Sequence, residues 1–157
     1  MKTKHILAAI VAAALTACSS TPAPTAAPAA PKSPCAVITK SAYSLYENDK
    51  NAKVRNAIAS IKKGGFDLDG YCEMGYESGR TNNMEKPTAL AAEMKQKLEA
   101  NKRKGTAGKL AASKGKTEAE RAAGRLAMDE AGTEIMKLAL IANVMNDSTN
   151  AGKAAAK

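Results

Sequence analysis

The apolar residues in the last third of the chain recur at helical spacing, and this pattern constrains the fold more than any other feature of the sequence. They follow one another at intervals of three or four residues: Met128, Ala131, Ile135, Leu138, Ala142 and Met145. Such intervals place side chains on one side of an α-helix. Three more apolar residues widen the stripe: Leu140, Ile141 and Val144. We therefore expect residues 135–145 to be mostly buried, in a helix that begins at the capping-box pair Thr117 and Glu120.

Two shorter helices are expected before residue 66. Ser33 supplies a hydroxyl cap and Pro34 suits the first helical position. The first helix would place three residues on one face: Ile38, Ala42 and Leu45. Asp49 is the candidate cap of the second helix, which would end at Gly64 and Gly65. Its apolar face consists of Val54, Ala57, Ile58 and Ile61.

Residues 66–80 allow two interpretations. A helix would place four residues on one face, with two glycines that permit close approach of a neighbour: Cys72, Gly75, Tyr76 and Gly79. Glycine costs up to about 1 kcal/mol in a helix interior, so a turn-rich segment is the alternative. A further helix is predicted over residues 87–104, from the four-residue spacing of Leu90, Met94 and Leu98.

The predicted fold class is all-α, because no alternating apolar and polar run of strand length occurs in the sequence. We expect a small bundle of about four to five helices with one disulfide over residues 35–146, preceded by a disordered Pro/Ala tether. The polar and small residues 147–157 predict a flexible C-terminal tail.

The first 17 residues have the three parts of a secretory signal peptide, with a basic start, an apolar middle and small residues before Cys18. The apolar part is roughly half as long as a membrane-spanning helix. We therefore expect residues 1–17 to be removed. Residues 18–34 would then form the tether, because they hold five of the six prolines and favour an extended polyproline II conformation.

The segment Leu15-Thr16-Ala17-Cys18 resembles the lipobox of bacterial lipoproteins. In that family the cysteine receives diacylglycerol, the peptide is cut before it, and the new amino group is acylated with palmitate or a similar fatty acid. The resemblance covers residues 1–20 and implies that Cys18 anchors the chain to a membrane, since several acyl chains hold firmly. Ser19 stands where lipoproteins of the inner membrane often carry Asp, which implies the outer membrane and a domain facing the periplasm. An ordinary signal peptide with a chance cysteine is the competing interpretation.

Cys35 and Cys72 are the remaining cysteines, and in an oxidising periplasm we expect them to form a disulfide. The chain-entropy model gives such a loop about 4 kcal/mol of stabilisation. That is a large fraction of the net stability of a small domain. Free thiols are the alternative.

Removal of the signal peptide also removes His5, the only histidine. With both remaining cysteines bonded, the usual general base, the cysteine nucleophile and the imidazole and thiolate metal ligands are missing. We therefore predict no enzyme, no metal and no cofactor. Asp67 and Asp69 resemble half of a calcium loop, but the position that needs a glutamate is Ser78, so a helix cap is the preferred interpretation.

One carboxylate, Glu77, keeps an enzymatic alternative open. Glu77-Ser78 faintly resembles the catalytic Glu-Ser segment of lytic transglycosylases, which use a carboxylic acid in a sugar groove. The glycine-rich segment expected downstream is missing. So are the aromatic residues that would line a sugar groove, because the chain has only four Tyr and one Phe.

Positive charge is concentrated between Lys86 and Arg125, with 11 basic and 4 acidic side chains. The candidate anion-binding residues are Lys102, Arg103, Lys104, Lys109, Lys114 and Lys116. The anions of the periplasm are lipid headgroups, lipopolysaccharide phosphates and peptidoglycan carboxylates. Nucleic acid is not expected, because no aromatic side chains are interleaved for base stacking. A solvated basic loop is the alternative.

These features predict a non-catalytic lipoprotein that binds a protein or polyanionic partner of the envelope through its basic helical domain. A second function is covalent attachment to peptidoglycan through the terminal Lys157, as in the major outer-membrane lipoprotein of enteric bacteria. A third is cell-wall cleavage by Glu77. The oligomeric state stays open, because the stripe from Met128 to Met145 fits a contact between chains as well as an internal core.

Overall fold

A computed structural model describes residues 32–157, and in this part the chain forms five helices and no strand. The helices are α1 (Cys35–Glu47), α2 (Ala52–Lys63), α3 (Leu68–Thr81), α4 (Glu85–Lys114) and α5 (Glu118–Ala155). The all-α prediction is confirmed for these residues. The expected signal peptide, Cys18 and most of the expected tether lie outside the described residues.

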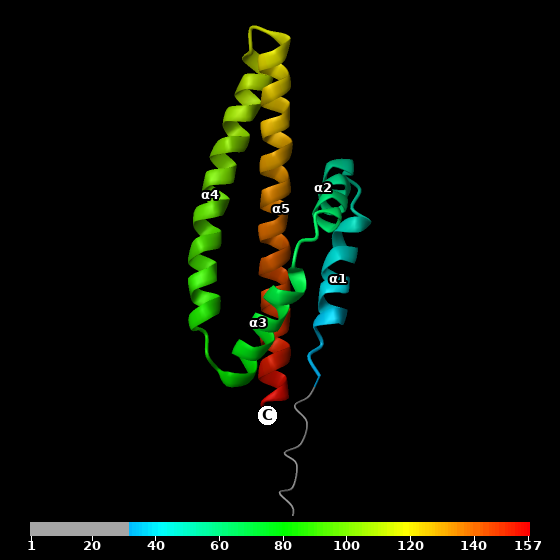
Figure 1. Ribbon diagram of the computed structural model, residues 1–157, viewed down its shortest axis with the longest axis vertical. Helices are drawn as coiled ribbons and strands as arrows, with labels where there is room; N and C mark the ends of the chain where they lie inside the picture. Colours follow the sequence, from blue (N-terminus) through cyan, green and yellow to red (C-terminus); the bar gives the residue numbers. More distant parts are fainter. Residues whose placement is uncertain (1–31) are drawn as a thin grey trace, which may run out of the picture. The chain divides into compact units, whose positions relative to one another are not determined.

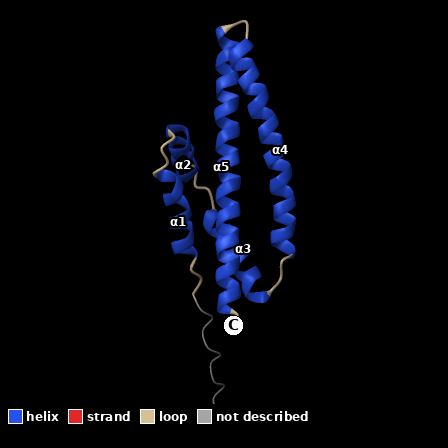
Figure 2. Cartoon of the chain, turned by 180° about the vertical axis from the view of Figure 1, so that it is seen from behind, coloured by secondary structure: helices blue, strands red, loops and turns tan. Residues whose placement is uncertain are grey.

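The long helix α5 contacts each of the other four helices. α4 runs along one side of it, α1 and α2 lie on the other side, and α3 crosses near its C-terminal end (Figure 1). The view from behind shows the same arrangement (Figure 2). α5 begins at the predicted capping box: Thr117 Oγ1 accepts the N–H of Glu120 at 3.2 Å, and the Glu120 carboxylate accepts the N–H of Thr117 at 3.1 Å.

α3 packs against α5 through residues that lack a side chain. A Cβ on Gly79 would overlap the carbonyl oxygen of Thr149, and a Cβ on Gly152 would overlap the carbonyl oxygen of Tyr76. Two helix backbones can approach this closely only where no Cβ stands between them. The helical interpretation of residues 66–80 is therefore correct, and the glycines that weaken the isolated helix are what allow its packing.

A disulfide joins Cys35 at the start of α1 to Cys72 in α3, as predicted. Both cysteines are buried. The core around them draws apolar side chains from α1, α2, α3 and α5: Ala42, Ile58, Ile61, Leu68, Tyr76, Leu140 and Val144. Thr39 Oγ1 donates a hydrogen bond of 2.7 Å to Asp69 Oδ1, so α1 and α3 are also joined by polar groups.

The ends of the shorter helices differ in part from the sequence prediction. The cap of α2 is Asn51, whose Oδ1 accepts the N–H of Lys53 at 3.0 Å. Asp49, which the sequence prediction named as the cap, instead precedes the helix, and its carboxylate accepts the N–H of Asn51 at 2.7 Å. Leu45 does not join the core face of α1 and is 67% exposed.

The prediction of a flexible tail over residues 147–157 is wrong for most of that segment, because α5 continues to Ala155. Ser148, Thr149 and Gly152 are buried there against α3. A contact between helices this close requires small residues, whether they are polar or apolar. The polar composition that predicted a tail is therefore compatible with a packed helix.

α4 extends to Lys114, beyond the predicted end at residue 104, and includes Gly105 and Gly108. Gly108 is buried, and a Cβ there would lie 2.8 Å from the carbonyl oxygen of Gly124 in α5. Apart from Gly108, α4 buries only Pro87, so most of its surface is open to solvent. No described helix combines the length and the apolar composition that crossing a membrane requires.

Candidate functional site

The six candidate anion-binding residues lie on α4 and in the turn that follows it, and all six are exposed. A helix turns by about 100° per residue, so Lys104 lies on the side of α4 next to α5. The other four residues on α4 lie roughly 100–140° around the helix axis from the buried Gly108, but in two directions: Lys102 and Lys109 on one flank, Arg103 and Lys114 on the other. The structure therefore places these four on the outer half of one helix and separates Lys104 and Lys116 from them.

Two of the six residues are paired with carboxylates. Lys102 Nζ lies 3.0 Å from Glu99 Oε1 one turn away, and Lys104 Nζ lies 2.6 Å from Glu130 Oε2 on α5. The hydrogen bond from Lys102 lowers the pKa of Glu99. Exposed pairs of this kind add little to stability. They do reduce the positive charge that these two lysines present to an outside anion.

Arg121 and Arg125 belong to the basic segment, but both donate hydrogen bonds to Glu118, over 3.0 and 2.7 Å. The hydrogen bonds from Arg125 and from Arg121 lower the pKa of Glu118. Arg121 also donates to the carbonyl oxygen of Gly115 at 2.9 Å. These arginines therefore fix the turn between α4 and α5 and contribute little free positive charge.

Three of the predicted residues on α4, Arg103, Lys109 and Lys114, have no ion pair within residues 32–157. Lys95 is exposed, also has no ion pair there, and lies seven residues before Lys102 on the same side of the helix. We call these residues together with Lys102 the α4 basic face: Lys95, Lys102, Arg103, Lys109 and Lys114. The sequence prediction missed Lys95, although its seven-residue spacing from Lys102 was a signal.

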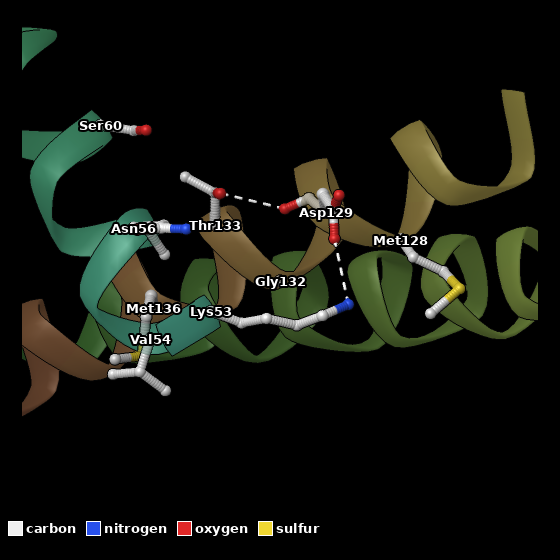
Figure 3. A pocket seen from close by; sticks show the side chains of 10 residues that line it. Lys53, Val54, Asn56, Ser60, Met128, Asp129, Gly132, Thr133 and Met136 are labelled. Carbon is white, nitrogen blue, oxygen red and sulfur yellow. Dashed lines mark hydrogen bonds and ion pairs between the residues drawn. The ribbon is translucent and has the colours of Figure 1, made fainter. Parts of the chain in front are cut away.

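A hollow of about 570 Å³ lies between α2 and the middle of α5. Figure 3 shows Lys53 of α2 extending toward Asp129 of α5, and the two charged atoms are 3.5 Å apart. Gly132 lines the hollow, and a Cβ added to it would meet no atom within 4 Å. The only charged groups of the lining neutralise each other, so this hollow presents no net charge to a ligand.

A second hollow of about 430 Å³ lies between the first part of α4 and the last part of α5, and we call it the α4–α5 groove. Its α4 wall is apolar and includes Leu90 and Met94. Its α5 wall changes from Ala142 and Met145 to polar residues and ends at Lys153. The sequence prediction missed this groove, because it assigned Ala142 and Met145 to the core stripe and Lys153 to a tail.

The alternative catalytic residue Glu77 is 56% exposed on α3, and its carboxylate accepts a hydrogen bond from Arg80 at 2.9 Å. That hydrogen bond raises the pKa of Arg80. Asp67 caps α3 by accepting the N–H of Gly70 at 2.8 Å, in agreement with the helix-cap interpretation. Among residues 32–157, no three His, Cys, Asp or Glu side chains are placed to hold a metal ion.

Lys157 is exposed and follows the last residue of α5 by two positions. Comparison of the chain with protein-family models, with curated proteins and with solved structures gives no match.

Proposed function

We propose that this chain is a lipid-anchored protein of the bacterial envelope that binds a polyanionic partner through the α4 basic face. In this proposal the anchor is Cys18, the membrane is the outer membrane, and the helical domain lies in the periplasm. The domain is a binding module without catalytic activity. The distribution of unpaired cations on α4 is the observation that carries the proposal.

Arg103, Lys109 and Lys114 lie within about 16 Å along one helix and have no ion pair in the described part of the chain. Their positive charges add to one another and raise the positive potential around α4. An anionic partner would be attracted by that potential. Because α4 buries only Pro87 and Gly108, the fold does not need these cations, and their concentration is better explained by binding.

The linear arrangement of these cations favours an extended polyanion over a single small anion. Charges spread along a helix can contact several phosphates or carboxylates of one polymer in succession. Lipopolysaccharide and peptidoglycan carry such repeated anionic groups, and lipopolysaccharide phosphates have the higher charge density. Lipopolysaccharide is therefore the first probe to use, with isolated cell wall as the second.

The first test reverses three unpaired charges together, as Arg103→Glu, Lys109→Glu and Lys114→Glu. We expect retention on immobilised lipopolysaccharide to fall at least tenfold. Raising the salt from low ionic strength to several times the physiological level should weaken binding of the unchanged protein, because the Debye length falls below about 8 Å. Binding is measured by equilibrium retention at several salt concentrations.

The matched control reverses three exposed lysines that also have no ion pair in residues 32–157: Lys40, Lys50 and Lys63. This control changes the net charge equally but leaves α4 intact, so it should bind within about threefold of the unchanged protein. Equal losses in both triple variants would show that net charge alone governs binding and would refute a site on α4. Cell-wall binding that resists hot detergent would instead indicate covalent attachment through Lys157.

The second test concerns the anchor and replaces Cys18 by Ser. We expect the protein to leave the membrane fraction and to keep its signal peptide, because the lipid-dependent cut cannot occur without the thiol. Membrane fractionation and the mass of the product measure both effects. Normal maturation together with unchanged sedimentation would refute the lipid anchor and leave the α4 basic face without its proposed location.

A further inference from the structure

We infer that the α4–α5 groove binds a single-chain fatty acid, with the acyl chain between the two helices and the carboxylate at Lys153. This inference is independent of the binding proposed for the α4 basic face. The groove contains none of the residues of that face.

The size and direction of the groove fit one extended acyl chain. Its lining lies within eleven residues of the chain from Met84 to Met94, and within twelve residues of α5 from Ala142 to Lys153. At a rise of about 1.5 Å per residue, both walls are roughly 15 Å long. A volume of about 430 Å³ over this length gives a narrow groove, which has room for one chain and not for two.

The α4 wall is apolar along its whole length, whereas the α5 wall changes from apolar residues at one end to hydrogen-bonding groups at the other. α4 and α5 are antiparallel, so Met94 faces the part of α5 that contains Ala142, and Met84 lies at the end of the groove where Lys153 is found. Met145 adds a third flexible methionine, a residue type that adapts to irregular apolar ligands. The polar residues Asn146 and Asn150 lie toward the Lys153 end.

The charge of the lining selects the headgroup. Lys153 is the only charged residue of the groove, is exposed, and has no ion pair within residues 32–157. A single ammonium group complements a single carboxylate, whereas a phosphate monoester, with a charge of about −1.5 to −2 at pH 7, would bring more negative charge than the groove offsets. The polar residues and the cation of the groove lie at one of its ends. An amphipathic helix or a second copy of this chain would not make use of this arrangement. A fatty acid uses both the apolar end and the cationic end.

The first measurement follows the methionine methyl groups by NMR in the full chain with Cys18→Ser, so that no attached acyl chain competes. Dodecanoate is added below its micelle concentration. We expect the methyl signals of Met84, Met94 and Met145 to shift and saturate. Met128 and Met136, which line the α2–α5 hollow, serve as internal controls and should not move.

Two variants then test the two ends of the site. Ala142→Trp fills the apolar end and should weaken dodecanoate binding at least tenfold, whereas Ala92→Trp, on the outer side of α4, should leave it unchanged. Lys153→Gln should weaken dodecanoate about tenfold and leave the uncharged analogue dodecanol unaffected. Lys63→Gln is the control for loss of one exposed lysine. Circular dichroism and thermal unfolding establish that each variant folds.

Several results would overturn the inference. Equal shifts at all five methyl groups, or undiminished binding by a folded Ala142→Trp variant, would show nonspecific association. Tighter binding of a two-chain phospholipid or a lysophospholipid than of dodecanoate would refute the fatty acid as ligand. Movement of the groove methyl signals with protein concentration alone would show that a second copy of the chain occupies the groove.

Discussion

α3 and α4 pack against the same helix, α5, in opposite ways. α3 has 14 residues and buries six of them, including Cys72 and both of its contact glycines, Gly75 and Gly79. α4 has 30 residues and buries two, Pro87 and Gly108. The short helix is therefore a structural element of the core, whereas the long helix keeps most of its surface exposed to solvent.

The difference arises from where glycines meet. Gly79 and Gly152 allow the backbones of α3 and α5 to touch, and the disulfide at Cys72 holds α3 from its other side. α4 meets α5 closely at Gly108, near the turn, and carries bulky side chains such as Met94 along its first half. In both views the two ribbons converge toward the turn and diverge toward α3 (Figures 1 and 2). The cations and the groove lie on the helix that is packed more loosely.

The largest expected effect comes from removal of the disulfide on the α3 side. The double variant Cys35→Ser with Cys72→Ser should lose about 4 kcal/mol of unfolding free energy, because the unfolded chain gains loop entropy. Urea unfolding measures the change, and hydrogen exchange should become faster in α3 than in the unchanged protein. Coincident unfolding curves for the two proteins would contradict the structural importance of α3.

A smaller loss is expected from one methyl group placed in the contact between α3 and α5. Gly152→Ala should lower the unfolding free energy by about 3 kcal/mol, because the new Cβ overlaps a backbone carbonyl that cannot rotate away. The same urea titration checks the value. A loss below about 1 kcal/mol would mean that the two helices separate easily and that the contrast with α4 is weaker than described.

The matched control gives the smallest effect, with the opposite sign. Gly132 lies in the same helix, but a Cβ there meets nothing within 4 Å. Gly132→Ala should therefore raise the unfolding free energy by up to about 1 kcal/mol, since alanine favours the helix. Destabilisation by this substitution would show that alanine in place of a glycine of α5 is unfavourable for a reason other than contact with α3.

The regular parts of the fold could be predicted from sequence because they depend on local signals. The capping box at Thr117 and the apolar spacing through residues 135–145 identified α5. The expectation that residues 135–145 are mostly buried is wrong, because only Leu140, Ile141 and Val144 are buried there and Ala142 is exposed. The last turns of α5 could not be predicted in the same way. Ser148 and Gly152 carry no apolar signal, and their burial depends on glycines in α3 that are distant in sequence.

The candidate site could be predicted from the sequence as a surplus of positive charge, but not as a surface. Sequence identified Arg103, Lys109 and Lys114, but it could not show that Lys104 is held by Glu130 on the neighbouring helix. Ion pairs between helices depend on the register of packing, which is set here by the contact of Gly108 with Gly124. For the same reason the groove, whose walls come from two helices, was not visible in either segment alone.

The disulfide has a consequence for where the two ends of the described chain lie relative to the α4 basic face. Cys35 is tied to α3, and α3 packs near the end of α5, so the described chain starts and finishes at one pole of the domain, opposite the turn at Gly115 (Figure 1). The 38 residues of α5 span about 57 Å at 1.5 Å per residue. The distance between Lys114 and the start of the described chain is therefore set by the lengths of the two long helices. Inserting or deleting whole turns in both long helices would reset that spacing without altering either end.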